Sequence, residues 1–189
     1  MEAFQSKLPN VGTTIFTVMS CLADEYGAIN LSQGFPDFQP PKDLLDRVSH
    51  YFHSGHNQYA PMIGVRSLRE ATARKIKRLY GVQPEPETEI TITSGATEAL
   101  FCAIHATVKK GDEVIVFDPA YDCYEPAITL AGARTTHLPL SLSDFSIDWE
   151  RLAASLSDRT RMVIINSPHN PSGAVLNQDD LTCLAELLR

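Results

Sequence analysis

The sequence predicts an α/β protein with three layers, in which helices cover both faces of a mainly parallel sheet. From residue 89 onward, short apolar or β-branched runs alternate four times with stretches of helical periodicity, as in strands joined by crossover helices. The runs at 114–117 and 162–165 are continuously apolar, as expected of strands covered on both faces. A chain of 189 residues is long enough to build such a core.

The region before residue 81 is predicted to be helical, with an irregular stretch at 30–41. Helices are expected at 17–26, 42–54 and 66–80, and Gly81 can end the third of them. This third helix also carries basic residues, for which we adopt the simple interpretation of a solvated face: Arg69, Arg74, Lys75, Lys77 and Arg78.

The alternating region begins at a run of isoleucines and threonines. Strands are predicted at 89–93, 113–117, 134–138 and 162–165. Between and after them, helices are predicted at 96–109 and 122–131, after the cap Asp148, and after the cap Asn177. Short strands joined by helices of this length imply parallel pairing with right-handed crossovers.

Composition excludes several classes of function. The net charge of −7 leaves no footprint for nucleic acid, and the longest aliphatic runs are too short to span a bilayer. No signal peptide is evident, so we expect a cytoplasmic protein without a membrane partner. His50, His53 and His56 lie three residues apart, but Gly55 interrupts the helix, so we expect exposed histidines and no metal site.

Polar and flexible residues follow three of the predicted strands. In parallel sheets, ligands bind beyond the carboxyl ends of the strands, so these turns should gather at one edge. The turn at 94–97 suits a phosphate, because Gly95 permits close approach and the N–H groups of Gly95, Ala96 and Thr97 open a helix. An ordinary Ser or Thr helix cap is the alternative for this turn.

The other two turns offer side chains suited to a flat ring. Tyr121 follows the second strand and could stack on such a ring, although an aromatic residue at a helix start often only packs. Asn170 lies in the turn at 166–173, where its amide could donate to a ring hydroxyl. A proline-rich connection without a ligand is the alternative there.

Taken together, the motifs resemble the fold-type I, class I/II aminotransferases that depend on pyridoxal 5'-phosphate. The likeness is strongest to the methionine, kynurenine and glutamine transaminase branch and runs from about residue 8 to the end. The matching segments are NLSQGFPDF at 30–38, NQYAPMIG at 57–64, SGATEAL at 94–100, DPAYDCYEP at 118–126 and NSPHNPSG at 166–173.

The resemblance implies a role for each matching position. Gly95, Ala96 and Thr97 would hold the cofactor phosphate, Tyr121 would stack on the pyridine ring and Asn170 would hydrogen-bond the ring hydroxyl. Tyr59 would reach the cofactor of a partner subunit, which implies a homodimer. Two residues would contact the substrate: Gly34 near its carboxylate, and Phe16 in the pocket for its side chain.

The resemblance also implies a domain organisation. Residues 1–40 would form an N-terminal arm and part of a small domain, and residues 41–189 the first part of the large domain that binds the cofactor. The family's Schiff-base lysine lies further along the chain than Arg189, so no catalytic residue is expected within this sequence. Lys109 and Lys110 would lie at the wrong end of the phosphate-binding helix to replace it.

Two functions therefore remain open. The first is transamination of an amino acid, of methionine or aromatic and kynurenine type, with a 2-oxo acid, to which this sequence contributes the N-terminal part. The second is a truncated and inactive fragment, or a phosphate-binding module that lacks the lysine. The predicted last helix returns to no strand, so we expect the sheet to be incomplete without further chain.

Overall fold

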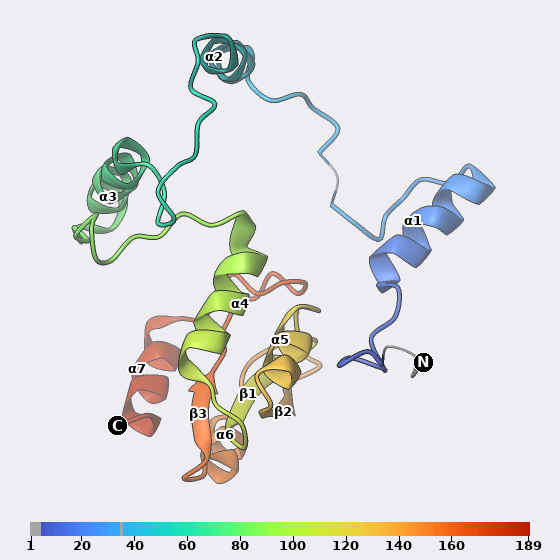
Figure 1. Ribbon diagram of the computed structural model, residues 1–189. Helices are drawn as coiled ribbons and strands as arrows, with labels where there is room; N and C mark the ends of the chain where they lie inside the picture. Colours follow the sequence, from blue (N-terminus) through green and yellow to red (C-terminus); the bar gives the residue numbers. More distant parts are fainter. Residues whose placement is uncertain (1–4, 35) are drawn as a thin grey trace. The chain divides into compact units, whose positions relative to one another are not determined.

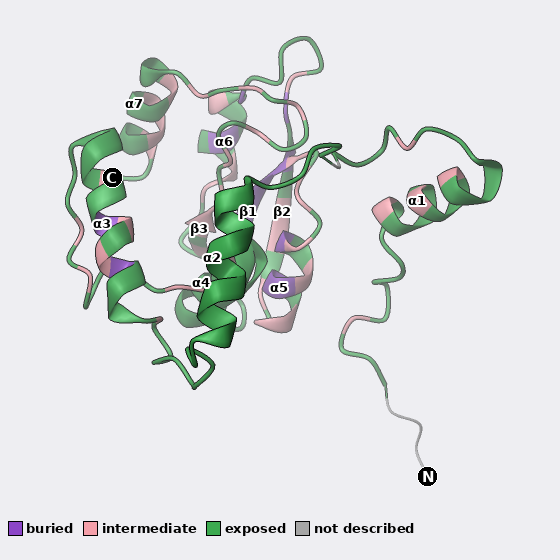
Figure 2. Cartoon of the chain, turned by 90° about the horizontal axis from the view of Figure 1, so that it is seen from above, coloured by how far each residue is buried: buried purple, intermediate pink, exposed green. Residues whose placement is uncertain are grey.

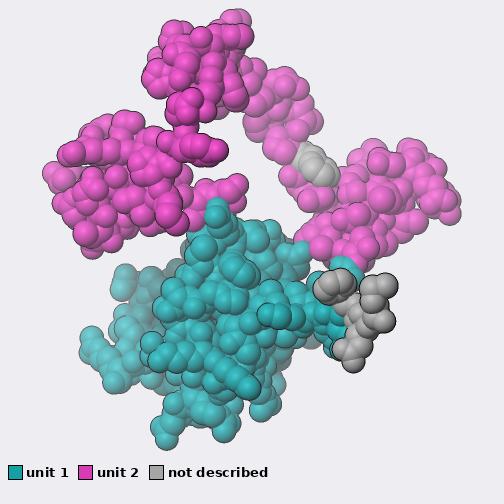
Figure 3. All heavy atoms as spheres, in the orientation of Figure 1, with its two compact units in different colours: residues 1–12, 95–189 teal, residues 13–94 magenta. Residues whose placement is uncertain are grey.

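The computed structural model describes residues 5–34 and 36–189, which form two compact units. Of the described residues, one unit comprises 5–12 and 95–189, and the other comprises 13–34 and 36–94 (Figure 3). The expected division at residue 40 concerns domains of the family and stays a prediction.

The larger unit is built on a three-stranded parallel sheet with the order β2-β1-β3 (Figure 1). Its strands are β1 (Glu113–Asp118), β2 (Arg134–Pro139) and β3 (Thr160–Val163). Its helices are α4 (Gly95–Thr107), α5 (Tyr124–Leu130), α6 (Trp149–Ser155) and α7 (Gln178–Leu187). The predicted α/β class with a mainly parallel sheet is confirmed.

Alternating side chains of the central strand β1 divide the core into two halves. Val114 and Val116 pack with Ile104 of α4 and Ile128 of α5 on one face. Ile115 and Phe117 lie on the opposite face, where they pack with Leu152 of α6 and where α7 also contributes leucines. The strand is buried along most of its length (Figure 2). The sheet is thus the middle of three layers, as its apolar runs predict.

Polar side chains fix the first residues of three of these elements, α7, α6 and β1. Asn177 forms a capping box with Asp180 at the start of α7, and Asp148 accepts a hydrogen bond from the backbone of Arg151 at the start of α6. At the start of β1, Arg159 donates to the Glu113 carboxylate at 2.7 Å. The hydrogen bonds from Arg159, and then from Ser157, hold the pKa of this carboxyl below its usual range.

The predicted strand at 89–93 is wrong. The structure describes this stretch as extended chain in the smaller unit, outside the sheet. The N–H of Ile92 donates to the carbonyl of Ile63, and the Ile92 side chain lies where a Cβ on Gly64 would come within 2.5 Å. Alternating isoleucines and threonines favour extended backbone, but a strand also needs a neighbouring strand to pair with.

The smaller unit contains α1 (Ile15–Tyr26), α2 (Lys42–His53) and α3 (Arg66–Tyr80). These bounds match the predicted helices to within two residues, and Gly81 caps α3 in the left-handed conformation. Neither α1 nor α2 has a buried residue, whereas α3 buries Arg69 and Ala73. No described helix is long and apolar enough to cross a membrane.

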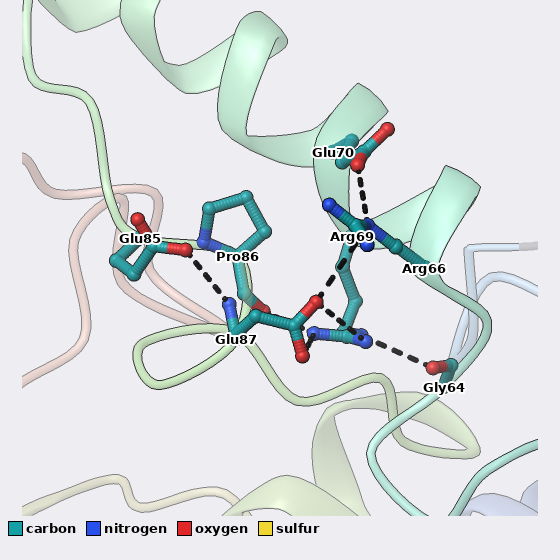
Figure 4. A network of polar contacts seen from close by, with 7 residues as sticks. All are labelled: Gly64, Arg66, Arg69, Glu70, Glu85, Pro86 and Glu87. Carbon is teal, nitrogen blue, oxygen red and sulfur yellow. Dashed lines mark hydrogen bonds and ion pairs between the residues drawn. The ribbon is translucent and has the colours of Figure 1, made fainter.

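The burial of Arg69 corrects the interpretation of the basic residues on α3 as a solvated face. Only 4% of this residue is exposed. Its guanidinium donates to the carbonyls of Gly64 and Pro86 and lies 3.2 Å from the Glu87 carboxylate (Figure 4). Arg66, one turn earlier, is exposed and pairs with Glu70 at 2.8 Å. Arg69 therefore joins the two loops that flank α3. The spacing of apolar residues along the helix does not indicate such contacts with distant loops.

Candidate functional site

A hollow of about 630 Å³ lies in the larger unit, where α4 begins and where the chain leaves β1 and β3. The first turns of α4 and the turns after β1 and β3 all contribute to it. The turns after β1 and β3 meet because parallel strands end at one edge, whereas the segment before α4 lies outside the sheet. It is lined by the following residues: Ala96, Thr97, Ala99, Leu100, Ala103, Tyr121, Tyr124, Ile165, Asn166 and Asn170. Four sequence-predicted residues, Ala96, Thr97, Tyr121 and Asn170, therefore share one cavity.

Gly95 is the first residue of α4 and sets the direction in which the helix begins. Its φ of 87° lies in a region that side chains rarely adopt, and a Cβ there would meet open space. Glycine is therefore required by the backbone angle and not by crowding. The first N–H groups of a helix have no partner within it and carry partial positive charge. Ala96 and Thr97 place this end of α4 on the hollow.

Tyr121 is half-buried and presents an aromatic ring to the hollow. It meets Tyr124 edge-on, with ring centroids 5.9 Å apart and an interplanar angle of 68°. Burial raises the pKa of the Tyr124 phenol, so this neighbour is neutral at physiological pH. The two rings give this wall of the cavity an aromatic surface, with one ring edge-on to the other.

The turn after β3 supplies the amides of the site. Asn170 is exposed and lines the hollow, and its backbone N–H donates to the side chain of Asn166 at 2.7 Å. Its neighbour His169 shares a hydrogen bond of 2.8 Å with the Ser172 hydroxyl. Asn166 itself also lines the hollow. The sequence argument did not single it out as a site residue, although it opens the same polar turn.

Cys123 is half-buried and lies in the turn after β1, between Tyr121 and Tyr124 in the sequence. Burial raises the pKa of its thiol, the Asp122 carboxylate adds to the rise, and a hydrogen bond with Thr97 acts in the opposite direction. The thiol is therefore protonated at neutral pH, which makes it a poor nucleophile. Its contact with Thr97 links the turn after β1 to the first turn of α4.

The other three predicted site residues lie in the smaller unit. Tyr59 is fully exposed, Gly34 is exposed with open space around it, and Phe16 is half-buried on α1. The structure describes these three residues within the smaller unit alone, so the roles expected for them stay predictions. Within residues 5–34 and 36–189, no group of three or more histidine, cysteine or carboxylate side chains is arranged to hold a metal ion.

Comparison with known proteins decides the family. Residues 26–189 match the family model of aminotransferase class I and II. The chain belongs to the class I and II aminotransferases. Members of this family in general depend on pyridoxal phosphate.

Relatives of this aminotransferase chain are similar over almost its whole length. It is 57% identical to a methionine aminotransferase of Escherichia coli over 95% of the chain, which is 47% of that protein. It is 34% identical to human kynurenine–oxoglutarate transaminase 3 over 96% of the chain and 42% of that protein. The chain therefore spans about half the length of the curated relatives it matches.

Solved structures that resemble this chain are also aminotransferases. The crystal structure of an E. coli methionine aminotransferase matches with a TM-score of 0.95 and 55% identity, covering 98% of this chain and 49% of that one. The structure of N-succinyldiaminopimelate aminotransferase from Mycobacterium tuberculosis matches with a TM-score of 0.92 and 43% identity, covering 98% and 49%.

Proposed function

We propose that this chain forms the cofactor-holding part of a pyridoxal-phosphate-dependent aminotransferase. The observation that carries the proposal is one hollow that is lined by the first turn of α4, by Tyr121 and by Asn170. A phosphorylated pyridine needs these three kinds of contact: N–H donors for the phosphate, an aromatic neighbour for the ring and a polar group for the ring hydroxyl.

Each contact has a physical rationale. The backbone of Gly95, Ala96 and Thr97 holds the phosphate, because a helix N-terminus favours negative charge and the Thr97 hydroxyl adds a donor. Tyr121 stacks on the ring and fixes its plane. Asn170 donates from its side-chain amide to the ring hydroxyl. Bound pyridoxal phosphate supplies an electron sink for charge that develops at the α-carbon of the amino acid.

The proposed reaction moves the amino group of an amino acid to a 2-oxo acid. The relatives named above act on methionine and kynurenine, which supports methionine or an aromatic amino acid as the donor. Gly34 lies against the substrate carboxylate and Phe16 lines the side-chain pocket in this proposal. Tyr59 reaches the phosphate bound to a partner subunit, so the protein works as a homodimer. We place this activity in the cytoplasm.

Catalysis further requires a lysine that reaches the cofactor. Among the described residues that line the hollow there is no lysine, and Lys109 and Lys110 follow the far end of α4. Borohydride reduction of the protein after unbound pyridoxal phosphate is removed, followed by peptide mass mapping that locates the modified lysine, tests for such a lysine, because free cofactor would modify any exposed amine. A stable cofactor adduct supports the transaminase. Reversible binding without an adduct supports the inactive cofactor-binding fragment.

Phosphate recognition is tested by Thr97→Val, which removes one hydroxyl at almost constant volume. Titration with pyridoxal phosphate should show affinity lowered about 10- to 100-fold, because a hydrogen bond to a charged group is lost. Titration with pyridoxal, which has no phosphate, should be unchanged. Thr107→Val is the matched control, since Thr107 is an exposed residue at the other end of α4 that donates to the carbonyl of Ala103.

Two results would contradict this assignment. Equal loss of pyridoxal phosphate affinity in the two threonine variants would show that the start of α4 has no special role. Equal affinity of the original protein for pyridoxal phosphate and for pyridoxal would show that the phosphate is not recognised. The amino donor is identified separately, by measuring 2-oxo acid formation from methionine, kynurenine and phenylalanine.

A further inference from the structure

The turn that carries Tyr121 is fixed at its two ends. It leaves β1 after Asp118 and enters α5 at Tyr124. The carbonyl of Asp118 accepts a hydrogen bond from the N–H of Leu140 at 2.9 Å, and the N–H of Tyr124 donates to the carbonyl of Tyr121 at 3.2 Å. The position of the Tyr121 ring in the hollow therefore depends on how firmly the end of β1 and the start of α5 are held together.

One imidazole from the neighbouring strand lies between these two ends. His137 belongs to β2, which pairs with β1 in parallel. Its Nδ1–H donates to the Asp118 carboxylate, with 3.0 Å to Oδ1 and 3.1 Å to Oδ2. Its other nitrogen, Nε2, lies 3.9 Å from Oε1 of Glu125 in the first turn of α5. A single side chain thus faces the carboxylates on both sides of the turn.

We propose that His137 is a positioning residue for Tyr121. By donating to Asp118 at the end of β1, with Glu125 of α5 near its other nitrogen, it fixes the span of the turn, and it thereby holds the Tyr121 ring at the angle needed to stack on the pyridine. This inference rests on the proposed function, because it gives the stacking residue its support. A hydrogen bond to a carboxylate is among the stronger ones in proteins.

The effect should be moderate because the hydrogen bond between His137 and Asp118 is not buried. The side chain of His137 is 38% exposed and that of Asp118 is 40% exposed, so water and salt weaken the contact. We expect His137→Leu to lower the affinity for pyridoxal phosphate about three- to tenfold, the range for an aromatic contact that loses its geometry. The affinity for inorganic phosphate should not change, because the start of α4 is untouched.

The experiment uses the protein as its gene encodes it, with His53→Leu on α2 as a control that also replaces an exposed histidine. Binding of pyridoxal phosphate and of inorganic phosphate is titrated for each variant, and hydrogen exchange of the amides at 120–124 is followed. His137→Leu should speed exchange in this turn, and the control should not. His137→Asn, which keeps an N–H near the position of Nδ1, should restore affinity to within about twofold.

Three outcomes would overturn the proposal. These are unchanged pyridoxal phosphate affinity in His137→Leu, equal loss of affinity for inorganic phosphate, and unchanged amide exchange in the turn. If the original protein does not bind pyridoxal phosphate, the proposed function fails instead. Amide exchange then still decides whether His137 holds the turn, because that measurement needs no cofactor.

Discussion

Replacing Arg69 by methionine tests how the loops around α3 are held. Methionine keeps an aliphatic stem but removes the guanidinium, so the carbonyls of Gly64 and Pro86 lose their donor. An unsatisfied buried acceptor costs about 1–3 kcal/mol, and both residues are only half-buried, which favours the lower part of that range. The ion pair with the half-exposed Glu87 adds less than about 1 kcal/mol. The expected total is about 2–4 kcal/mol.

Native-state hydrogen exchange measures this loss where it should occur. The N–H of Ile92 donates to Ile63 and the N–H of Gly64 donates to Pro61, so both amides report on the loops that Arg69 joins. A loss of 2–4 kcal/mol corresponds to exchange that is faster by about 30- to 1,000-fold. Protection in β1, which lies in the other unit, should change much less.

Arg66→Met is the matched control, because it makes the same substitution one turn earlier on α3. The side chain of Arg66 is 75% exposed and pairs with Glu70 four residues later. Such a pair contributes about 0.3–0.5 kcal/mol, so exchange should rise only about twofold. Equal acceleration of amide exchange at Ile92 in the two variants would refute the reasoning, because the buried guanidinium of Arg69 would then stabilise these loops no more than the exposed one of Arg66.

Two further predictions concern a backbone position and a buried carboxylate. Gly64→Ala should lower the free energy of unfolding by about 2–4 kcal/mol, because φ is 95° and the new Cβ would meet Ile92 at 2.5 Å. Gly55→Ala should be destabilised only by the backbone strain of its φ of 85°, since a Cβ there meets open space. Denaturant unfolding of both variants checks this, and equal losses of stability would contradict it. The hydrogen bonds from Arg159 hold the pKa of Glu113 lower in the folded protein than in the unfolded chain, so the ionised pair stabilises the fold at neutral pH. This stabilisation is lost as the pH falls below the unfolded pKa of about 4.3 and then through the folded pKa. Glu113→Gln should therefore flatten the dependence of the thermal midpoint on pH between 6 and 3, and an unchanged slope would count against it.

Much of the secondary structure follows from local signals that the sequence shows directly. The capping box at Asn177 and the left-handed Gly81 depend on residues a few positions apart, and both appear as predicted. The apolar run of β1 likewise predicts a strand covered on both faces. The run at 89–93 has equal local preference for extended backbone, yet it lies outside the sheet, because pairing depends on a partner that local sequence does not name.

In the candidate site, too, part of the arrangement was predicted from the sequence and part is seen only in the structure. The rule that parallel strands end at one edge predicted that Tyr121 and Asn170 would meet, and the structure places both on one hollow. Thr97 lines the same hollow, but the segment before it is not a strand of the sheet, so this rule does not explain its place. The contact of His137 with Asp118 joins residues 19 positions apart through the pairing of β1 with β2, and no periodicity indicates it.

By itself, the sequence determined the α/β class, the helices with their caps and the turns that carry polar residues, because these depend on neighbours within a turn or two of the chain. Only the tertiary structure decided that Arg69 is buried, that residues 89–93 leave the sheet and that His137 faces the turn of Tyr121. These depend on which distant segments meet. That is fixed by the packing of the whole unit, in which a charge can be buried once carbonyls and a carboxylate surround it.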